Sequence, residues 1–199
     1  MRLSRRSFIA TLAALTAIPA REALAEPFAV DMKEGKKLPF KFQRKEMAFE
    51  TSAAPGTVVV DPKKCFLYVV LGGGQAIRYG VALGKSAHAW EGEVVIKKMA
   101  EWPIWVPAPY HLKVKPELAK WKEGMPGGPD NPMGARAMYL FKGEVDTINR
   151  IHGAAKVSDI GKKATAGCIG MLNADVIDLY SRVQVGTRVV MMSKSGLFG

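Results

Sequence analysis

The sequence predicts a β-hairpin in the stretch CFLYVVLGGGQAIRYGVAL, residues 65–83. Two apolar runs, residues 65–71 and 75–83, flank the three glycines 72–74. Short apolar runs joined by a glycine-rich turn are typical of two antiparallel strands. The glycines lack the Gly-Lys-Ser/Thr sequence and the following helix of a phosphate-binding loop. The stretch therefore predicts β-structure and not a nucleotide site.

Further strands are expected on both sides of this hairpin. Apolar and β-branched runs bounded by turn residues predict strands at residues 57–61, 93–98, 135–141, 147–152 and 187–192. One helix is expected, with Asn173 as its N-cap. Its apolar face has helical spacing and consists of Val176, Leu179, Tyr180 and Val183. Many short strands with a single helix predict a mostly β domain.

The longest segment without a periodic pattern is residues 102–132, which contains seven prolines. Only residues 116–122 within it have a helix-like pattern. A loop this long in a small domain usually serves as a lid or a binding loop. We therefore expect it to form one wall of a functional site.

Composition limits the class of protein. The chain has 199 residues, of which 48% are hydrophobic and 24% charged, so a disordered chain is excluded. It has only 2 Cys and 3 His, which excludes a cysteine-rich zinc module or a disulfide scaffold. No run of apolar residues is long enough for an ordinary membrane-spanning helix.

The first 25 residues are expected to be a twin-arginine (Tat) signal peptide. Arg5-Arg6 precedes an apolar run at residues 8–20, and Ala23-Leu24-Ala25 forms a small-x-small cleavage site. The alternative is an uncleaved amphipathic helix. The mature chain would start at Glu26, with an N-terminal extension at 26–55, a folded domain at 56–193 and a tail at 194–199. No transmembrane segment is expected in the mature chain.

Charge and compartment together indicate the partner. The chain carries a net charge of +11, and the signal contains four Arg and one Glu, so its removal leaves +8. An exported protein rarely meets nucleic acid, so nucleic acid is not the expected partner. The anionic polymer outside a bacterial inner membrane is the cell wall, which a basic surface would attract. The alternative is a basic surface kept only for solubility.

The cysteines and histidines offer few nucleophile–base pairs. Cys65 lies in an apolar strand pattern and is expected to be a small buried residue. Cys168 lies among small residues at 164–170, where a carbonyl substrate could approach the sulfur and backbone amides could face an oxyanion. The preceding Lys162 and Lys163 would favour the reactive thiolate. A Cys65–Cys168 disulfide is the alternative for an oxidising compartment.

Among the three histidines, position favours His152. His88 lies in an expected turn and His111 in the proline-rich loop, where solvated histidines are common. His152 ends an expected strand, and Gly153 allows the chain to turn sharply away. The residues alone therefore favour a pair of Cys168 with His152.

These two segments resemble the active-site motif of the L,D-transpeptidase (YkuD) family. That motif has a His-Gly pair and, sixteen residues after the His, the Cys of a Ser-His-Gly-Cys-x-Arg-Met segment; Cys168 follows His152 by 16 residues. The segments 173–180, 127–136 and 60–84 also resemble the family. The resemblance spans about residues 56–193.

The resemblance implies a β-sandwich-like catalytic domain acting on peptidoglycan in the periplasm. Cys168 would be the nucleophile and His152 the general base, oriented by the Gly153 carbonyl. The amide of Gly167 would help to form the oxyanion hole. The other residues implied for oxyanion or substrate binding are Thr165, Ile169 and Arg136. No metal or organic cofactor is needed, and carbapenems would acylate the cysteine.

The implied substrate is a peptidoglycan stem peptide. Its third-residue carbonyl would form a thioester with the cysteine, with loss of the terminal D-amino acid. An amine of another stem, or of an outer-membrane protein, would then receive the acyl group. The alternatives are a carboxypeptidase or endopeptidase, in which water resolves the thioester, and a silent wall-binding module.

The motif departs from the family pattern in four places. Thr165 replaces Ser, and Ala-Ala-Lys-Val at 154–157 replaces the usual Thr-Asn-x-Pro after His-Gly. Ala166 replaces the second His, and Gly170 replaces the Arg that follows the Cys by two residues. An Arg there would bind a carboxylate or brace the loop, and Gly can do neither. Lys156, Lys162 or Lys163 could compensate for its charge.

Overall fold

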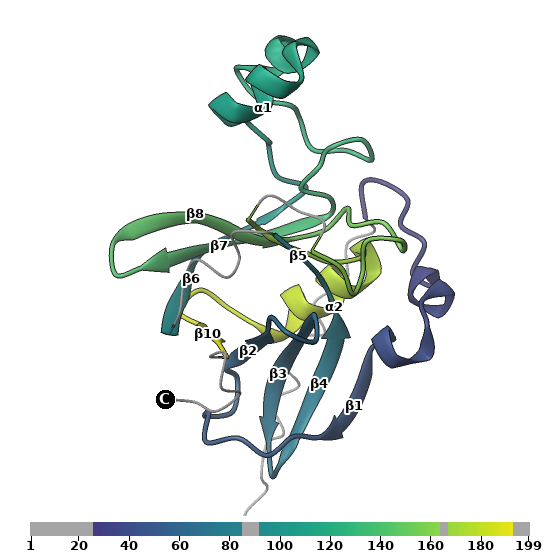
Figure 1. Ribbon diagram of the computed structural model, residues 1–199, viewed down its shortest axis with the longest axis vertical. Coiled ribbons are helices and arrows are strands. Elements are labelled where there is room, and N and C mark those ends of the chain that lie inside the picture. The colour runs from purple at the N-terminus through teal and green to yellow at the C-terminus, as the bar shows by residue number, and fades with distance from the viewer. Residues whose placement is uncertain (1–25, 85–91, 164–166, 193–199) are drawn as a thin grey trace, which may run out of the picture.

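The computed structural model describes residues 26–84, 92–163 and 167–192 (Figure 1). Its strands form one ten-stranded sheet with the order β1-β4-β3-β2-β10-β6-β7-β8-β9-β5. The strands are β1 Lys45–Ala48, β2 Val58–Asp61, β3 Phe66–Gly72, β4 Gln75–Gly80, β5 Ala82–Leu83, β6 Gly92–Glu101, β7 Arg136–Lys142, β8 Val145–His152, β9 Ile169–Gly170 and β10 Arg188–Met191. The helices are α1 Pro109–Val114 and α2 Asn173–Arg182, with 3-10 turns η1 Glu34–Lys37, η2 Phe40–Phe42 and η3 Pro116–Trp121.

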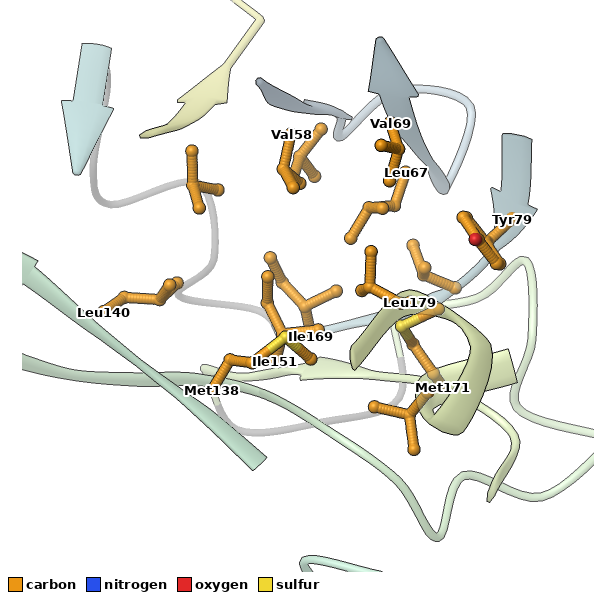
Figure 2. Packing of buried hydrophobic residues seen from close by; sticks show 14 of the residues in the cluster. Val58, Leu67, Val69, Tyr79, Met138, Leu140, Ile151, Ile169, Met171 and Leu179 are labelled. Atoms are coloured by element: carbon orange, nitrogen blue, oxygen red, sulfur yellow. The ribbon is translucent and has the colours of Figure 1, made fainter. Parts of the chain in front are cut away.

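The sheet curls into two layers around one core. Only Val81 separates β4 from β5, yet the two strands lie toward opposite ends of the sheet order, so the sheet must fold back on itself. Figure 2 shows the result: side chains from β2, β3 and β4 face side chains from β7, β8, β9 and α2. The predicted mostly β, sandwich-like fold is confirmed. The expected strand at 75–83 is two strands, because the chain changes layer at Val81.

Helix α2 fills the space between the layers with Val176 and Leu179, as its apolar spacing predicts. The expectation that Asn173 is its N-cap is wrong by one residue, since Leu172 occupies the cap and Asn173 is the first helical residue. The Asn173 side chain instead accepts hydrogen bonds from the backbone N–H groups of Ala135 and Ala154.

The segment 26–55, expected as an extension along the surface, adds a strand that the sequence pattern did not reveal. Strand β1 pairs antiparallel with β4 at the edge of the sheet. The following Phe49 stacks on Tyr68 with ring centroids 4.3 Å apart. Residues of this segment thereby cover an outer apolar cluster on β2, β3 and β4.

The proline-rich loop projects from one end of the molecule and carries α1 and η3 (Figure 1). The helix-like pattern at 116–122 corresponds to η3, whereas α1 was not expected. Asn131 is buried and its amide donates to the carbonyls of Pro103, Met125 and Pro126. One side chain thus joins three backbone carbonyls at the base of the loop. Among the described residues, no helix is long and apolar enough to cross a bilayer.

Candidate active site

Strand pairing brings the two motif segments side by side. Strands β8 and β9 pair in parallel, with Ile151 opposite Ile169 and His152 opposite Gly170. Both isoleucines point into the core. Because side chains alternate along a strand, His152 points to the other face. Cys168 comes directly before β9, and strand spacing and rise put its Cα about 8 Å from that of His152.

The His152 ring is fixed by its own backbone neighbour. Its Nδ1 lies 2.8 Å from the Gly153 carbonyl oxygen. A carbonyl can only accept, so Nδ1 carries the proton and Nε2 is left as the basic nitrogen of the neutral ring. Burial lowers the pKa of His152 below its ordinary value, despite the opposing effect of this hydrogen bond. The imidazole is therefore neutral near pH 7 and able to accept a proton.

Gly153 is held by contacts that exclude a larger residue. Its N–H donates to the carbonyls of Met133 and Arg136. A Cβ at Gly153 would lie 2.2 Å from Asn173 Oδ1. The same oxygen accepts from Ala154, whose φ of 61° lies in the left-handed region. The glycine and the asparagine together set the path of the chain after His152.

The Cys168 loop is held against Gly84. The Gly84 N–H donates to the Cys168 carbonyl at 3.1 Å. A Cβ at Gly84 would lie 2.2 Å from the Gly167 nitrogen, so the two backbones meet without side chains between them. The next residue, Ile169, pairs with Leu83 and buries its side chain. Ile169 can therefore contribute to the site only through its backbone.

The Cys168 thiol is half-buried, and burial raises its pKa above the ordinary value. A hydrogen bond from the Arg150 backbone and the Arg150 charge act in the opposite direction. The charge that lowers the pKa of Cys168 comes from Arg150, whereas the expected Lys163 lowers the pKa of Cys65. Cys65 is buried, as expected, and no disulfide joins it to Cys168.

Comparison with known proteins assigns the chain to a family. The model of the YkuD L,D-transpeptidase catalytic domain matches residues 55–191. The chain belongs to this family. It is 35% identical over 143 residues to "Putative L,D-transpeptidase YqjB" of Bacillus subtilis (strain 168), covering 71% of this chain and 73% of the relative. It spans between 27% and 46% of the length of several other curated relatives.

Solved structures show the same fold. A Brucella melitensis protein described as "Probable carnitine operon oxidoreductase caia" is 44% identical, with a TM-score of 0.54, covering 78% of this chain and 96% of that one. An L,D-transpeptidase from Mycobacterium smegmatis has a TM-score of 0.51 at 19% identity, covering 71% of this chain and 60% of that one. The second likeness concerns the fold alone.

In this L,D-transpeptidase, the side chain of Arg136 points away from His152 and Cys168. Its neighbour Ala137 is paired with His152, so the Arg136 side chain points to the opposite face. There its guanidinium binds both carboxylate oxygens of Glu26. The same carboxylate accepts from Trp102 at 2.8 Å, at the start of the proline-rich loop. The arrangement indicates a structural role for Arg136.

We expect Glu26→Gln to lower the free energy of unfolding by about 1–3 kcal/mol, because it removes the nearer counter-ion of the buried Arg136 cation and leaves only the more exposed Glu101, 3.7 Å away. The Arg136 hydrogen bond holds the pKa of Glu26 below its usual value, so this contribution is lost as pH falls through that pKa. Urea unfolding would measure the change. Glu93→Gln is the matched control, since its pair with Arg188 is exposed and its loss should cost less than about 1 kcal/mol. Equal losses in the two variants would contradict the prediction.

Three expected candidates contribute nothing further to the described site. His88 and Thr165 lie outside the described residues. His111 lies in α1, where its Nδ1 accepts from the Ala108 N–H. Within 26–84, 92–163 and 167–192, no three His, Cys, Asp or Glu side chains form a group that could hold a metal ion.

Sequence reasoning missed three residues that shape the site: Gly84, Arg150 and the side chain of Asn173. Gly84 is distant in sequence from Cys168, and only the pairing of β5 with β9 brings the two segments together. Arg150 had a signal, because it is two residues from His152 in an expected strand and must share its face.

Proposed function

We propose that the chain is a peptidoglycan L,D-transpeptidase with Cys168 as its nucleophile. The observation that supports the proposal is the pairing of β8 with β9, which brings the strand that ends at His152 beside the segment of Cys168, while the Gly153 carbonyl holds the imidazole. The Cys168 sulfur attacks the carbonyl of the third stem-peptide residue. The peptide bond to the terminal D-amino acid breaks, that residue leaves as an amine, and a thioester remains.

His152 moves the proton in both halves of the reaction. Its Nε2 takes the thiol proton as the sulfur attacks and returns it to the departing amine. The backbone amides of Gly167 and Cys168 stabilise the oxyanion of the tetrahedral intermediate. An amine of a second stem peptide, or of an outer-membrane protein, then attacks the thioester and restores the thiol.

The charge of the mature chain supports this substrate class. Stem peptides carry several carboxylates, and the chain after residue 25 has a net charge of +8. The proline-rich loop at residues 102–132 lies between β6 and β7, next to the strands that carry the site. It is the segment that we propose closes over bound peptide.

Incubation of residues 26–199 with defined muropeptides tests the proposal. Mass analysis should detect cross-linked dimers together with the released D-amino acid. Cys65→Ser should keep this activity, whereas Cys168→Ala should abolish it while remaining folded. Trimmed monomers without dimers would favour the hydrolytic alternative, in which water resolves the thioester. Unchanged muropeptides that nevertheless bind the protein would favour a wall-binding module.

We infer that the protein works in the periplasm after export by the Tat pathway, as the arginine pair and cleavage site suggest. Arg5→Lys with Arg6→Lys should retain the precursor in the cytoplasm, because the Tat receptor reads the arginine pair. Cell fractionation and immunoblotting would measure the distribution. Replacement of Arg21 by Lys is the control and should leave export unchanged. Normal export of the double variant would indicate a Sec signal instead.

A further inference from the structure

We propose that Arg150 is a positioning residue for the nucleophile, supplying from β8 the positive charge that Gly170 cannot supply from β9. The inference rests on the proposed function of Cys168. The family motif usually carries its arginine two residues after the cysteine, on the strand of the cysteine itself. Here the neighbouring parallel strand would carry it.

Register puts Arg150 directly beside Cys168. Ile151 pairs with Ile169, and Arg150 and Cys168 are the residues that directly precede this pair on the two neighbouring segments. The Arg150 backbone N–H donates to the Cys168 thiol. The Arg150 side chain shares the face of His152 by alternation along β8. The Arg150 side chain is only 15% exposed, so its charge is poorly screened by solvent.

A local distortion of β8 holds the Arg150 side chain in place. Arg150 Nη1 and Nη2 donate to the two oxygens of Asp146 at 2.7 and 2.8 Å. In a regular strand, residues four apart are about 13 Å from each other and could not pair in this way. The β7–β8 register shifts between Tyr139 and Phe141, and Ile148 has a φ of 62°. A β-branched residue in the left-handed region is strained, and here the distortion shortens the strand and brings Asp146 to Arg150.

An aromatic ring supports the guanidinium from the other side. Arg150 pairs with Tyr139 across β7–β8, and its Cζ lies 4.5 Å from the ring centroid. Lys98, paired with Tyr139 across β6–β7, lies 4.9 Å from the same ring. The titratable groups that the register places on this face are Glu93, Lys98, Tyr139, Asp146, Arg150, His152 and Arg188, of which Glu93 and Arg188 lie on the far side of β7 from Cys168.

The Arg150 charge offsets the free-energy cost of forming a thiolate at the half-buried Cys168. Burial disfavours the Cys168 thiolate, and an adjacent cation favours it. Asp146 reduces the net charge of the guanidinium and fixes its position on the outer face of β8. The basic side chain closest in register to the thiol is thus Arg150, whereas Lys163 acts on Cys65.

The test measures the thiol itself and needs no peptidoglycan. In a Cys65→Ser background, the rate of alkylation of Cys168 by iodoacetamide is followed against pH. This reagent is neutral, so attraction of the reagent by Arg150 does not contribute. Arg150→Gln should raise the midpoint of the profile by about one pH unit and slow alkylation at neutral pH by about tenfold. Arg150→Lys should keep most of the wild-type rate because it keeps the charge.

Arg188→Gln is the matched control, because it removes an exposed arginine of β10 and should leave the profile unchanged. If Arg150→Gln does not fold, Arg150→Met removes the charge at similar length. A folded neutral variant with the wild-type profile would overturn the proposal. So would an Arg150→Lys profile as shifted as that of Arg150→Gln. An Arg150-dependent profile without any muropeptide turnover would instead overturn the proposed function and leave the charge effect established.

Discussion

Replacement of His152 by alanine is expected to slow acylation of Cys168 by a carbapenem by about 10²–10⁴-fold, the usual contribution of a general base. A carbapenem has a strained amide carbonyl, and its acylation needs only the nucleophile, its base and the oxyanion donors. The pKa of Cys168 is raised by burial, so the thiol is mostly protonated near pH 7. Without His152, the proposed mechanism has no group that removes this proton from the thiol.

The pH dependence gives this prediction a second readout. Because burial lowers the pKa of His152, the wild-type rate should fall only at pH values below the ordinary imidazole range. In His152→Ala the rate should rise continuously with pH as the thiol ionises by itself, so the defect should shrink at alkaline pH. Intact-protein mass against time measures both. His111→Ala is the control, since His111 lies in α1 of the loop. A small, pH-independent defect in folded His152→Ala would contradict the role of base.

The fold was predictable from sequence wherever one strand could be recognised by its own pattern. The β3–β4 hairpin, β8 ending at His152 and the apolar face of α2 all follow from local periodicity. Strand β1 was not predictable in this way, because its residues Lys45–Ala48 are mostly exposed and polar. Its position is set by the unpaired edge of β4, which is a property of the tertiary structure.

The same distinction applies to the site. The choice of His152, Gly153 and Cys168 came from a motif spacing that resembles the family, whereas the pairing of β8 with β9 that brings their segments together is a property of the tertiary structure. The role of Asn173 was not predicted, since its side-chain oxygen accepts from Ala135 and Ala154, which belong to separate segments. Arg136 was placed in the site because it lies in a segment that resembles the family. The alternation of β7 turns it to the opposite face and toward Glu26.

Gly84→Ala is expected to lower the rate of Cys168 acylation by about 10²-fold while leaving the protein folded. The new Cβ would lie 2.2 Å from the Gly167 nitrogen and 2.3 Å from its Cα. Both neighbours are backbone atoms, so the contact cannot be relieved by rotation of a side chain, and the Gly167–Cys168 segment must move. A displacement of about 1 Å at reacting groups can cost about 10²-fold in rate, and loss of one oxyanion donor costs about 10²–10³-fold.

The stability of the variant separates this effect from general damage. Overpacking at one site costs about 1–3 kcal/mol, which urea unfolding would measure. Gly35→Ala is the matched control, because no heavy atom lies within 4 Å of its added Cβ and its φ is not positive. It should keep both stability and acylation rate.

A Gly84→Ala protein that acylates at the wild-type rate would mean that the Gly167 and Cys168 amides do not form the oxyanion hole. A loss of acylation in proportion to the unfolded fraction would mean the same. A folded variant that still alkylates with iodoacetamide but acylates slowly would place the defect at the oxyanion, because alkylation of a thiolate develops no oxyanion and needs no such donors.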